Sequence, residues 1–251
     1  MTEGNAEPLY HEKQFAQLYD TANSWSADRT YCLNLAENCQ SVLDLGCGTG
    51  SLAAEIAMKG PRVVGVDPAP GMLDVARQRQ GGDRVTWVQA DARHVRLDEK
   101  FDLICMTGLA FQCFLTREDR AALFATIAAH MNPKGKFVFD SRNPVREEWR
   151  EWTPELSRRT LQHPQLGDID EWHDVAFDAA VSVATYGTTY FVNATGETWR
   201  TQARIAFPSR YELTTLLAGA GLQVDHWMGD WDGSAWHETA LENIALGASR
   251  P

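Results

Sequence analysis

The segment DLGCGTG at residues 44–50 constrains the fold of this chain more than any other part of its sequence. It follows the apolar run Ser41–Leu45, which is typical of a buried strand, and precedes residues 51–59, whose apolar side chains recur at the spacing of one helix face. Glycines between a strand and a helix permit a tight turn and let a ligand approach the backbone at the helix N-terminus. The segment therefore predicts a ligand-binding strand–loop–helix unit.

Strand and helix patterns alternate at short intervals from about residue 28 to residue 140. Nearly continuous apolar strands between amphipathic helices are typical of a parallel sheet that is covered on both faces. The expected strands are Ser41–Leu45, Arg62–Asp67, Arg84–Gln89, Phe101–Met106 and Lys136–Asp140. The pattern predicts a doubly wound, Rossmann-like α/β fold.

The pattern changes between Ser141 and about Phe207, where apolar side chains take alternate positions and a turn is expected at Asn193–Gly196. Such alternation is typical of antiparallel strands with one solvated face. After residue 208 a helix and two further strands, expected to pair antiparallel, complete a mostly parallel sheet of seven strands. We predict a core of residues 1–140 and 208–251, with an antiparallel β cap of residues 141–207 inserted after the fifth strand.

Composition excludes several classes of protein. The formal charge is −11, which disfavours a general grip on nucleic acid. No run approaches the roughly 20 apolar residues of a membrane helix, and the polar start predicts no secretory signal. The five cysteines are odd in number and lack C-x-x-C spacing, so we expect reduced thiols and no metal site. We predict a cytoplasmic protein without nucleic-acid or membrane partners, and its oligomeric state stays open.

Acidic residues mark the ends of the first three expected strands. Asp44 lies at the first, Asp67 ends the second and Asp91 follows the third. The carboxyl ends of parallel strands meet at one edge of such a sheet, where these folds bind their ligands. A carboxylate in the place of Asp67 can accept hydrogen bonds from ribose hydroxyls, and one at Asp91 can read an adenine amino group.

Together these residues resemble the class I S-adenosylmethionine-dependent methyltransferases, in particular small-molecule enzymes with a cap inserted after strand five. The resemblance covers about residues 38–140 and is looser towards the end of the chain. It depends on residues 44–50, Gly65-Val66-Asp67 with Met72-Leu73, Asp91-Ala92, Phe101-Asp102-Leu103 and residues 131–136.

The resemblance implies S-adenosyl-L-methionine as cofactor and S-adenosyl-L-homocysteine as product. Asp67 would then bind the ribose, while Asp91 and Ala92 read the adenine edge. The remaining implied contacts are Asp44, Gly46, Gly48 and Gly50 in the loop, Pro68 and Met72 beside the adenine, Met106 at the end of strand four, and Tyr19 over the methionine carboxylate.

A dinucleotide cofactor is the rival interpretation of the loop, because residues 48–53 satisfy G-x-G-x-x-A. Against it, Asp44 would bring a carboxylate close to a pyrophosphate, which is an unfavourable contact between like charges. A sulfonium cofactor with one carboxylate and one ammonium group has no such conflict.

Methyl transfer from a sulfonium is a direct displacement, so catalysis can be largely positioning. A base is needed only where the acceptor must first lose a proton, and no catalytic dyad is recognisable, so the catalytic residues stay unassigned. His173 is the sequence's candidate if a base is required. Residues 106–109 lack the tetrapeptide of amino-methylating DNA enzymes, which agrees with a small-molecule acceptor.

The acceptor is expected between the strand ends and the cap. Two roles stay open for Arg142 there: a clamp for an acceptor carboxylate or phosphate, or an ordinary ion pair. The candidate acceptor contacts are Phe111, Gln112, Arg142 and Trp199. Two other functions stay open: a protein methyltransferase, and an S-adenosylmethionine-binding protein without turnover.

Overall fold

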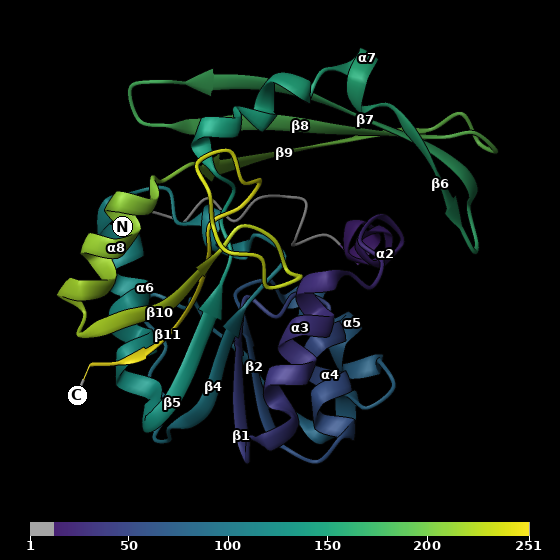
Figure 1. Ribbon diagram of the computed structural model, residues 1–251. Coiled ribbons are helices and arrows are strands. Elements are labelled where there is room, and N and C mark those ends of the chain that lie inside the picture. The colour runs from purple at the N-terminus through teal and green to yellow at the C-terminus, as the bar shows by residue number, and fades with distance from the viewer. Residues whose placement is uncertain (1–12, 251) are drawn as a thin grey trace.

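The computed structural model describes residues 13–250, with side chains from Leu18 onward, and contains two β-sheets (Figure 1). The larger sheet has seven strands in the order β10-β11-β5-β4-β1-β2-β3, and the smaller has four in the order β6-β7-β8-β9. The smaller sheet lies across one end of the larger one, as Figure 1 shows. The predicted fold, a mostly parallel seven-stranded sheet with an antiparallel β cap, is confirmed.

The first five strands of the larger sheet run parallel to one another. The bounds of β1, β2 and β4 agree with the prediction, whereas β5 begins at Met131 instead of Lys136 because Met131 already pairs with Phe101 before a bulge. The strands are β1 (Ser41–Leu45), β2 (Arg62–Asp67), β3 (Val85–Gln89), β4 (Phe101–Met106) and β5 (Met131–Phe139).

The last two strands extend the sheet beyond β5. Strand β10 (Leu222–Met228) pairs antiparallel with β11 (Ile244–Ser249), which in turn pairs antiparallel with β5. The predicted antiparallel pairing of the final strands is therefore confirmed.

Helices cover both faces of the large sheet because consecutive side chains of each strand point to opposite faces. Leu43 of β1 belongs to an apolar cluster with Phe124 of α6, whereas its neighbour Val42 packs in a second cluster with Ile56 of α4. Burial of each such side chain stabilises the fold by about 1.5–3 kcal/mol. The α-helices are α2 (Lys13–Ala22), α3 (Ala27–Leu35), α4 (Ser51–Met58), α5 (Pro70–Gln78), α6 (Arg117–His130), α7 (Pro154–Ser157) and α8 (Arg210–Gly219).

Short 3₁₀ turns and capping side chains complete the connections. Two side chains cap helix N-termini: Thr116 accepts the Asp119 N–H at 3.1 Å, and Ser209 accepts the Glu212 N–H at 3.2 Å. The 3₁₀ helices are η1 (Ala36–Asn38), η2 (Gly82–Arg84), η3 (Ala110–Cys113), η4 (Pro144–Arg146) and η5 (Glu148–Glu151).

The smaller sheet, which we call the cap, is antiparallel throughout. The turn predicted at Asn193–Gly196 lies between its last two strands in the chain, β8 and β9. A ring stack between Trp149 of η5 and Phe177, with centroids 3.9 Å apart, packs the connection from β5 onto the cap. The strands are β6 (Arg159–His163), β7 (Gly167–Asp178), β8 (Val183–Val192) and β9 (Thr198–Ala206).

All four cap strands fall within residues 141–207, and we retain that range as the proposed extent of the cap. Within the described residues, none of the helices combines the length and the apolar character needed to cross a membrane.

Candidate functional site

The glycine loop between β1 and α4 is shaped by three left-handed residues. Gly46, Gly48 and Gly50 have φ values of 70°, 54° and 75°, which disfavour residues with a side chain. The N–H groups of Gly46 and Cys47 donate to the Val66 carbonyl at 2.8 and 3.1 Å, so the loop is fixed against β2. A Cβ at Gly48 would meet no atom within 4 Å, which leaves the loop open on that side.

Asp67 lies at the end of β2 beside this loop, as predicted. Its carboxylate accepts the Gly48 N–H at 2.9 Å and the Ala69 N–H at 2.8 Å. These bonds hold a buried carboxylate, 8% exposed, between the glycine loop and the start of α5.

A small cavity opens between the glycine loop, α2, α3 and the residues after β4. It brings together three of the predicted cofactor contacts from distant parts of the chain, namely Tyr19, Asp44 and the loop. Its lining residues are Tyr19, Arg29, Asp44, Gly46, Cys47, Gly48, Thr49, Ser51, Leu52, Thr107 and Gly108.

The charges in this small cavity suit a zwitterion. Asp44 is 3% exposed, and burial, together with repulsion from Asp67, raises its pKa to about 7. Arg29 lies in the same lining and draws the pKa of Asp44 back down. Its guanidinium donates to the carbonyls of Asn23 and Ser24, both at 3.1 Å. Sequence reasoning missed Arg29, because no local pattern connects this helix residue with the loop.

Helix α2 is tied to the glycine loop by its own acidic residue. Asp20 accepts the Thr49 hydroxyl at 2.6 Å and Arg79 Nη2 at 2.5 Å, while Arg79 Nε donates to the Thr49 carbonyl at 2.9 Å. The neighbouring Tyr19 hydroxyl lies 3.9 Å from the position that a Cβ of Gly108 would take. Burial raises the pKa of Tyr19 to about 12, so this hydroxyl stays protonated at neutral pH.

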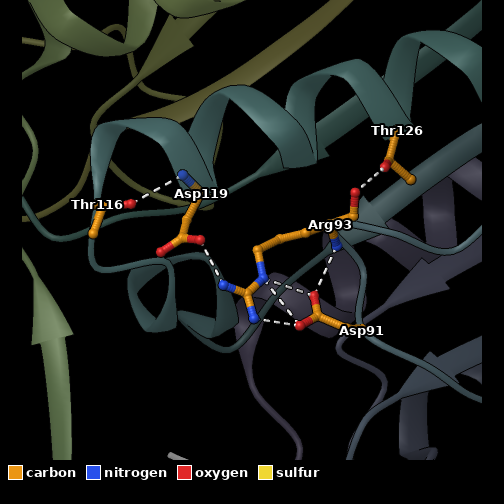
Figure 2. Close-up of polar contacts among 5 residues, drawn as sticks. All are labelled: Asp91, Arg93, Thr116, Asp119 and Thr126. Atoms are coloured by element: carbon orange, nitrogen blue, oxygen red, sulfur yellow. Dashed lines mark hydrogen bonds and ion pairs between the residues drawn. The ribbon is translucent and has the colours of Figure 1, made fainter. Parts of the chain in front are cut away.

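Asp91, the predicted adenine contact, is held by an arginine two residues along (Figure 2). Arg93 donates its N–H to Oδ1 at 2.8 Å, Nε to both oxygens at 3.0 Å, and Nη2 to Oδ2 at 2.5 Å. Its Nη1 reaches Asp119 at 2.5 Å, and its carbonyl accepts the Thr126 hydroxyl at 3.1 Å. Burial alone would raise the pKa of Asp91, but the hydrogen bonds from Arg93 lower it below its usual value.

The other predicted cofactor residues lie around the same strand ends. Ala92 and Met72 are buried, Met72 in a cluster that includes Tyr19, whereas Pro68 is exposed. Met106, at the end of β4, has its terminal carbon 4.0 Å from the position of a Cβ on Gly46.

A larger cavity, of about 290 Å³, lies beside the end of β5. Arg142 lines it but is engaged by neighbours: Nε donates to Glu148 at 3.0 Å, Nη1 donates to Gln112 at 2.9 Å, and the guanidinium lies 5.0 Å above the Trp152 ring. The lining residues are Leu109, Arg142, Arg146, Glu148, Glu151, Leu241 and Glu242.

Only two of the four predicted acceptor contacts lie at or beside the larger cavity. Arg142 lines the larger cavity, and Gln112 supports it while donating to the Ala206 carbonyl of the cap at 2.7 Å. Phe111 lies in the core instead, where its ring stacks 4.6 Å from Phe139, because the turn after β4 directs it inward. Trp199 packs in a cluster between the cap and α2.

Two carboxyl groups near the larger cavity were missed. Asp140, 2% exposed at the end of β5, accepts the Leu109 N–H at 3.0 Å, and Glu242 accepts Trp231 Nε1 at 3.0 Å. Burial and repulsion from Glu242 hold the pKa of Asp140 well above its ordinary value, and burial raises that of Glu242 to about 7. The strand-end rule that identified Asp67 applies to Asp140 too, whereas Glu242 has no sequence signal.

Fold and site together define a doubly wound α/β protein with a glycine loop after β1 and buried carboxyl groups at the ends of β1 and β2. Residues 42–135 match the family described as "Methyltransferase domain". The chain is 27% identical over 212 residues to the cypemycin N-terminal methyltransferase of Streptomyces sp, with 82% of each protein covered. It is 36% identical over 104 residues to the malonyl-[acyl-carrier protein] O-methyltransferase of Anoxybacillus flavithermus, covering 41% of this chain and 39% of that protein.

The solved structure of the CcbJ methyltransferase from Streptomyces caelestis has the same fold. Its TM-score is 0.77 at 17% identity, with 94% of this chain and 97% of that chain covered. Residues 42–135 thus form a methyltransferase domain, as the sequence motifs predicted, and the protein is an S-adenosylmethionine-dependent methyltransferase.

Proposed function

We propose that this enzyme transfers the methyl group of S-adenosylmethionine to a small-molecule acceptor in the larger cavity and releases S-adenosylhomocysteine. The observation that supports the proposal is that a carboxyl group, Asp44, and a guanidinium, Arg29, line the same small cavity, next to a second cavity that could receive the acceptor. Names of relatives agree with a transferase of this kind, since they include N- and O-methyltransferases.

The cofactor's amino-acid part fits the small cavity by charge. Asp44 would take the ammonium group and Arg29 the carboxylate, with Tyr19 above them. The open side of Gly48 leaves the backbone accessible to the cofactor. Asp67 would bind the ribose hydroxyls from the adjoining strand end.

The adenine would lie beyond Asp67, against the loop after β3. A carboxylate has about four acceptor positions, and Arg93 makes four hydrogen bonds to Asp91, so the adenine amino group would replace one of the two bonds from the shared Nε. The backbone of Ala92 would provide the second contact. Met72 and Pro68 would flank the ring, and Met106 would face the cofactor from β4.

S-Adenosylmethionine supplies a methyl group activated by its sulfonium. The protein's contribution is then to hold the acceptor in line with the methyl carbon and to exclude water. Arg142, buttressed by Gln112 and Glu148, gives one wall of the larger cavity a fixed shape for this task. Phe111 and Trp199 would act only through packing.

A protein methyltransferase is the second candidate, because the cypemycin enzyme is named for an N-terminal methylation. A cytoplasmic location and the absence of a nucleic-acid partner stay at the level of predictions.

The test uses isotope-labelled S-adenosylmethionine with a small-molecule extract and, in parallel, with a protein extract, read by mass spectrometry. We expect a labelled small molecule with the wild type. The Asp67→Ala variant should bind the cofactor about 10- to 100-fold more weakly, as expected for lost hydrogen bonds to a charged group. The matched control is Asp74→Ala, an exposed carboxylate on α5.

Label found only in proteins would favour the second candidate. Cofactor binding without labelled product in either extract would contradict an enzymatic role.

A further inference from the structure

We propose that the acceptor is an amine and that Glu242, in the lining of the larger cavity, removes its proton. This proposal rests on the proposed function and gives it a substrate class. It is carried by the junction of the two cavities, by the partners of the charged side chains there, and by the chemistry that those side chains permit.

The two cavities share one short wall. Thr107 and Gly108 line the small cavity, whereas the next residue, Leu109, lines the larger one. The wall follows β4 directly, at the edge of the sheet where the cofactor's reactive end is expected. A molecule in the larger cavity would therefore lie on the far side of residues 107–109 from the cofactor's amino-acid part.

This wall is held in an unusual conformation. Leu109 has a φ of 62°, a left-handed value that is costly for a residue with a side chain, and it follows Gly108 at 66°. The buried Asp140 carboxylate accepts the Leu109 N–H at 3.0 Å and thereby stabilises the turn. Strain of this kind, supported by a buried polar group, is typical of functional sites.

Three glutamates, Glu148, Glu151 and Glu242, and two arginines line the larger cavity, so acidic side chains are in the majority; Arg146 is exposed, and Arg142 is engaged by protein partners. Arg142 donates to Glu148 and Gln112 and lies over Trp152. Glu242, by contrast, forms no ion pair with any residue that the structure describes and has a neutral donor, Trp231 Nε1, at 3.0 Å. A cationic group would be the natural complement to this carboxylate.

The charged groups around Glu242 come from three other parts of the fold. They are Asp140 and Arg142 after β5, Glu148 in η5, and Asp28 in α3. Burial is the main reason that the pKa of Glu242 rises to about 7, and Asp28 and Glu148 raise it further against the pull of Arg142. A base of this strength is matched to neutral pH.

Among the possible acceptor groups, the proton affinity and charge of an amine suit Glu242 best. Amino groups of proteins have pKa values of about 8 to 10, so Glu242 can deprotonate an ammonium group at a small cost. An alcohol, with a pKa near the roughly 15.7 of water, lies far beyond its reach. A carboxylate acceptor would need no base and would be repelled by Glu242 and Asp140.

The proposed reaction moves one proton and one methyl group. The acceptor's ammonium gives its proton to the Glu242 carboxylate, and the freed nitrogen lone pair forms the new N–C bond. The S–C bond breaks with its electron pair going to sulfur, which becomes a neutral thioether. The proton on Glu242 passes to solvent through the exposed rim of the cavity.

The first test repeats the labelling of a small-molecule extract after treatment with N-hydroxysuccinimide acetate, which acylates amines. We expect the labelled product to disappear. A labelled product that persists overturns the amine proposal but leaves the methyltransferase intact. An absence of labelled product from both treated and untreated extracts, with cofactor bound, counts against the proposed function itself and the inference with it.

The second test measures methylation of the acceptor that the first test identifies, with the Glu242→Gln variant. The amide oxygen of this variant can still accept the hydrogen bond from Trp231 Nε1. We expect kcat to fall about 100-fold, the usual range for loss of a general base, with the Kd of S-adenosylmethionine unchanged. The rise of the wild-type rate with pH through about 7 should also disappear. Glu155→Gln, an exposed carboxylate on α7, is the matched control.

His173 provides the competing outcome. Its ring bonds the Thr188 hydroxyl at 3.1 Å on the cap. If His173→Gln removes the pH dependence and Glu242→Gln retains it, the assignment of the base is overturned.

Discussion

Replacement of Asp44 by asparagine should stabilise the cofactor-free protein while weakening its hold on the cofactor. Burial and the neighbouring Asp67 raise the pKa of Asp44 from 3.8 to about 7. The folded protein therefore binds the proton more tightly than the unfolded chain does. The ionised carboxylate reduces stability progressively as the pH rises from about 4 to about 7, and the full cost applies above that.

The effect on the free energy of unfolding follows from the pKa shift of Asp44. A difference of about 3 pKa units corresponds to about 4 kcal/mol at pH 8, and to between 1 and 2 kcal/mol at about pH 5. The gain in free energy of unfolding from Asp44→Asn should thus be about 2–3 kcal/mol larger at pH 8 than at pH 5. The Ala53 N–H that bonds Asp44 can still be accepted by the amide oxygen.

Urea unfolding without cofactor, at several pH values between 5 and 8, measures this difference. Asp83→Asn, at an exposed aspartate, is the matched control. In parallel, calorimetric titration should show S-adenosylmethionine binding the variant at least tenfold more weakly. The wild-type affinity should increase with pH up to about 7, because the cofactor's ammonium favours ionised Asp44. A stability gain that is equal at pH 5 and pH 8, or an unchanged affinity, would refute this reasoning.

Three further changes test other parts of the site. Arg29→Ala should weaken cofactor binding at least tenfold in the same titration, with little change in unfolding midpoint. Gly50→Ala should lower the free energy of unfolding by about 2–4 kcal/mol, since a Cβ there would overlap the Trp87 ring at a φ of 75°. The matched Gly48→Ala has open space and should cost only about 1–2 kcal/mol. Arg93→Ala should raise the pKa of Asp91, because the hydrogen bonds that lower it are lost, and nuclear magnetic resonance titration measures this pKa.

Much of the fold could be predicted because its signals are local. The bounds of β1, β2 and β4 follow from apolar runs, and the glycine loop follows from residues whose left-handed backbone few other residues tolerate. The alternation within residues 175–183 indicated antiparallel strands, but these residues form the end of β7, a turn at residues 179–182 and the start of β8. By contrast β6 was not predicted, since Arg159–His163 exposes most of its side chains and carries no apolar period.

The residues of the site likewise divide into those that a local sequence signal identifies and those that only the fold brings together. Asp44 and Asp67 belong to one strand–loop–strand unit, so their positions follow from the sequence. Arg29 and Glu242 reach the site from α3 and from the segment before β11, and only the packed sheet brings them there. Phe111 shows the converse, because the left-handed Leu109 turns the chain so that this ring enters the core.

The bonds between Asp20, Thr49 and Arg79 have a consequence for turnover. They attach α2, which carries Tyr19 over the small cavity, to the very loop that would hold the cofactor. We expect the hydrogen bonds of Asp20 to break in every cycle, so that spent cofactor can be replaced. We expect the lifetime of the Asp20 contacts to set an upper limit on how fast the enzyme can work, however quickly the methyl group moves.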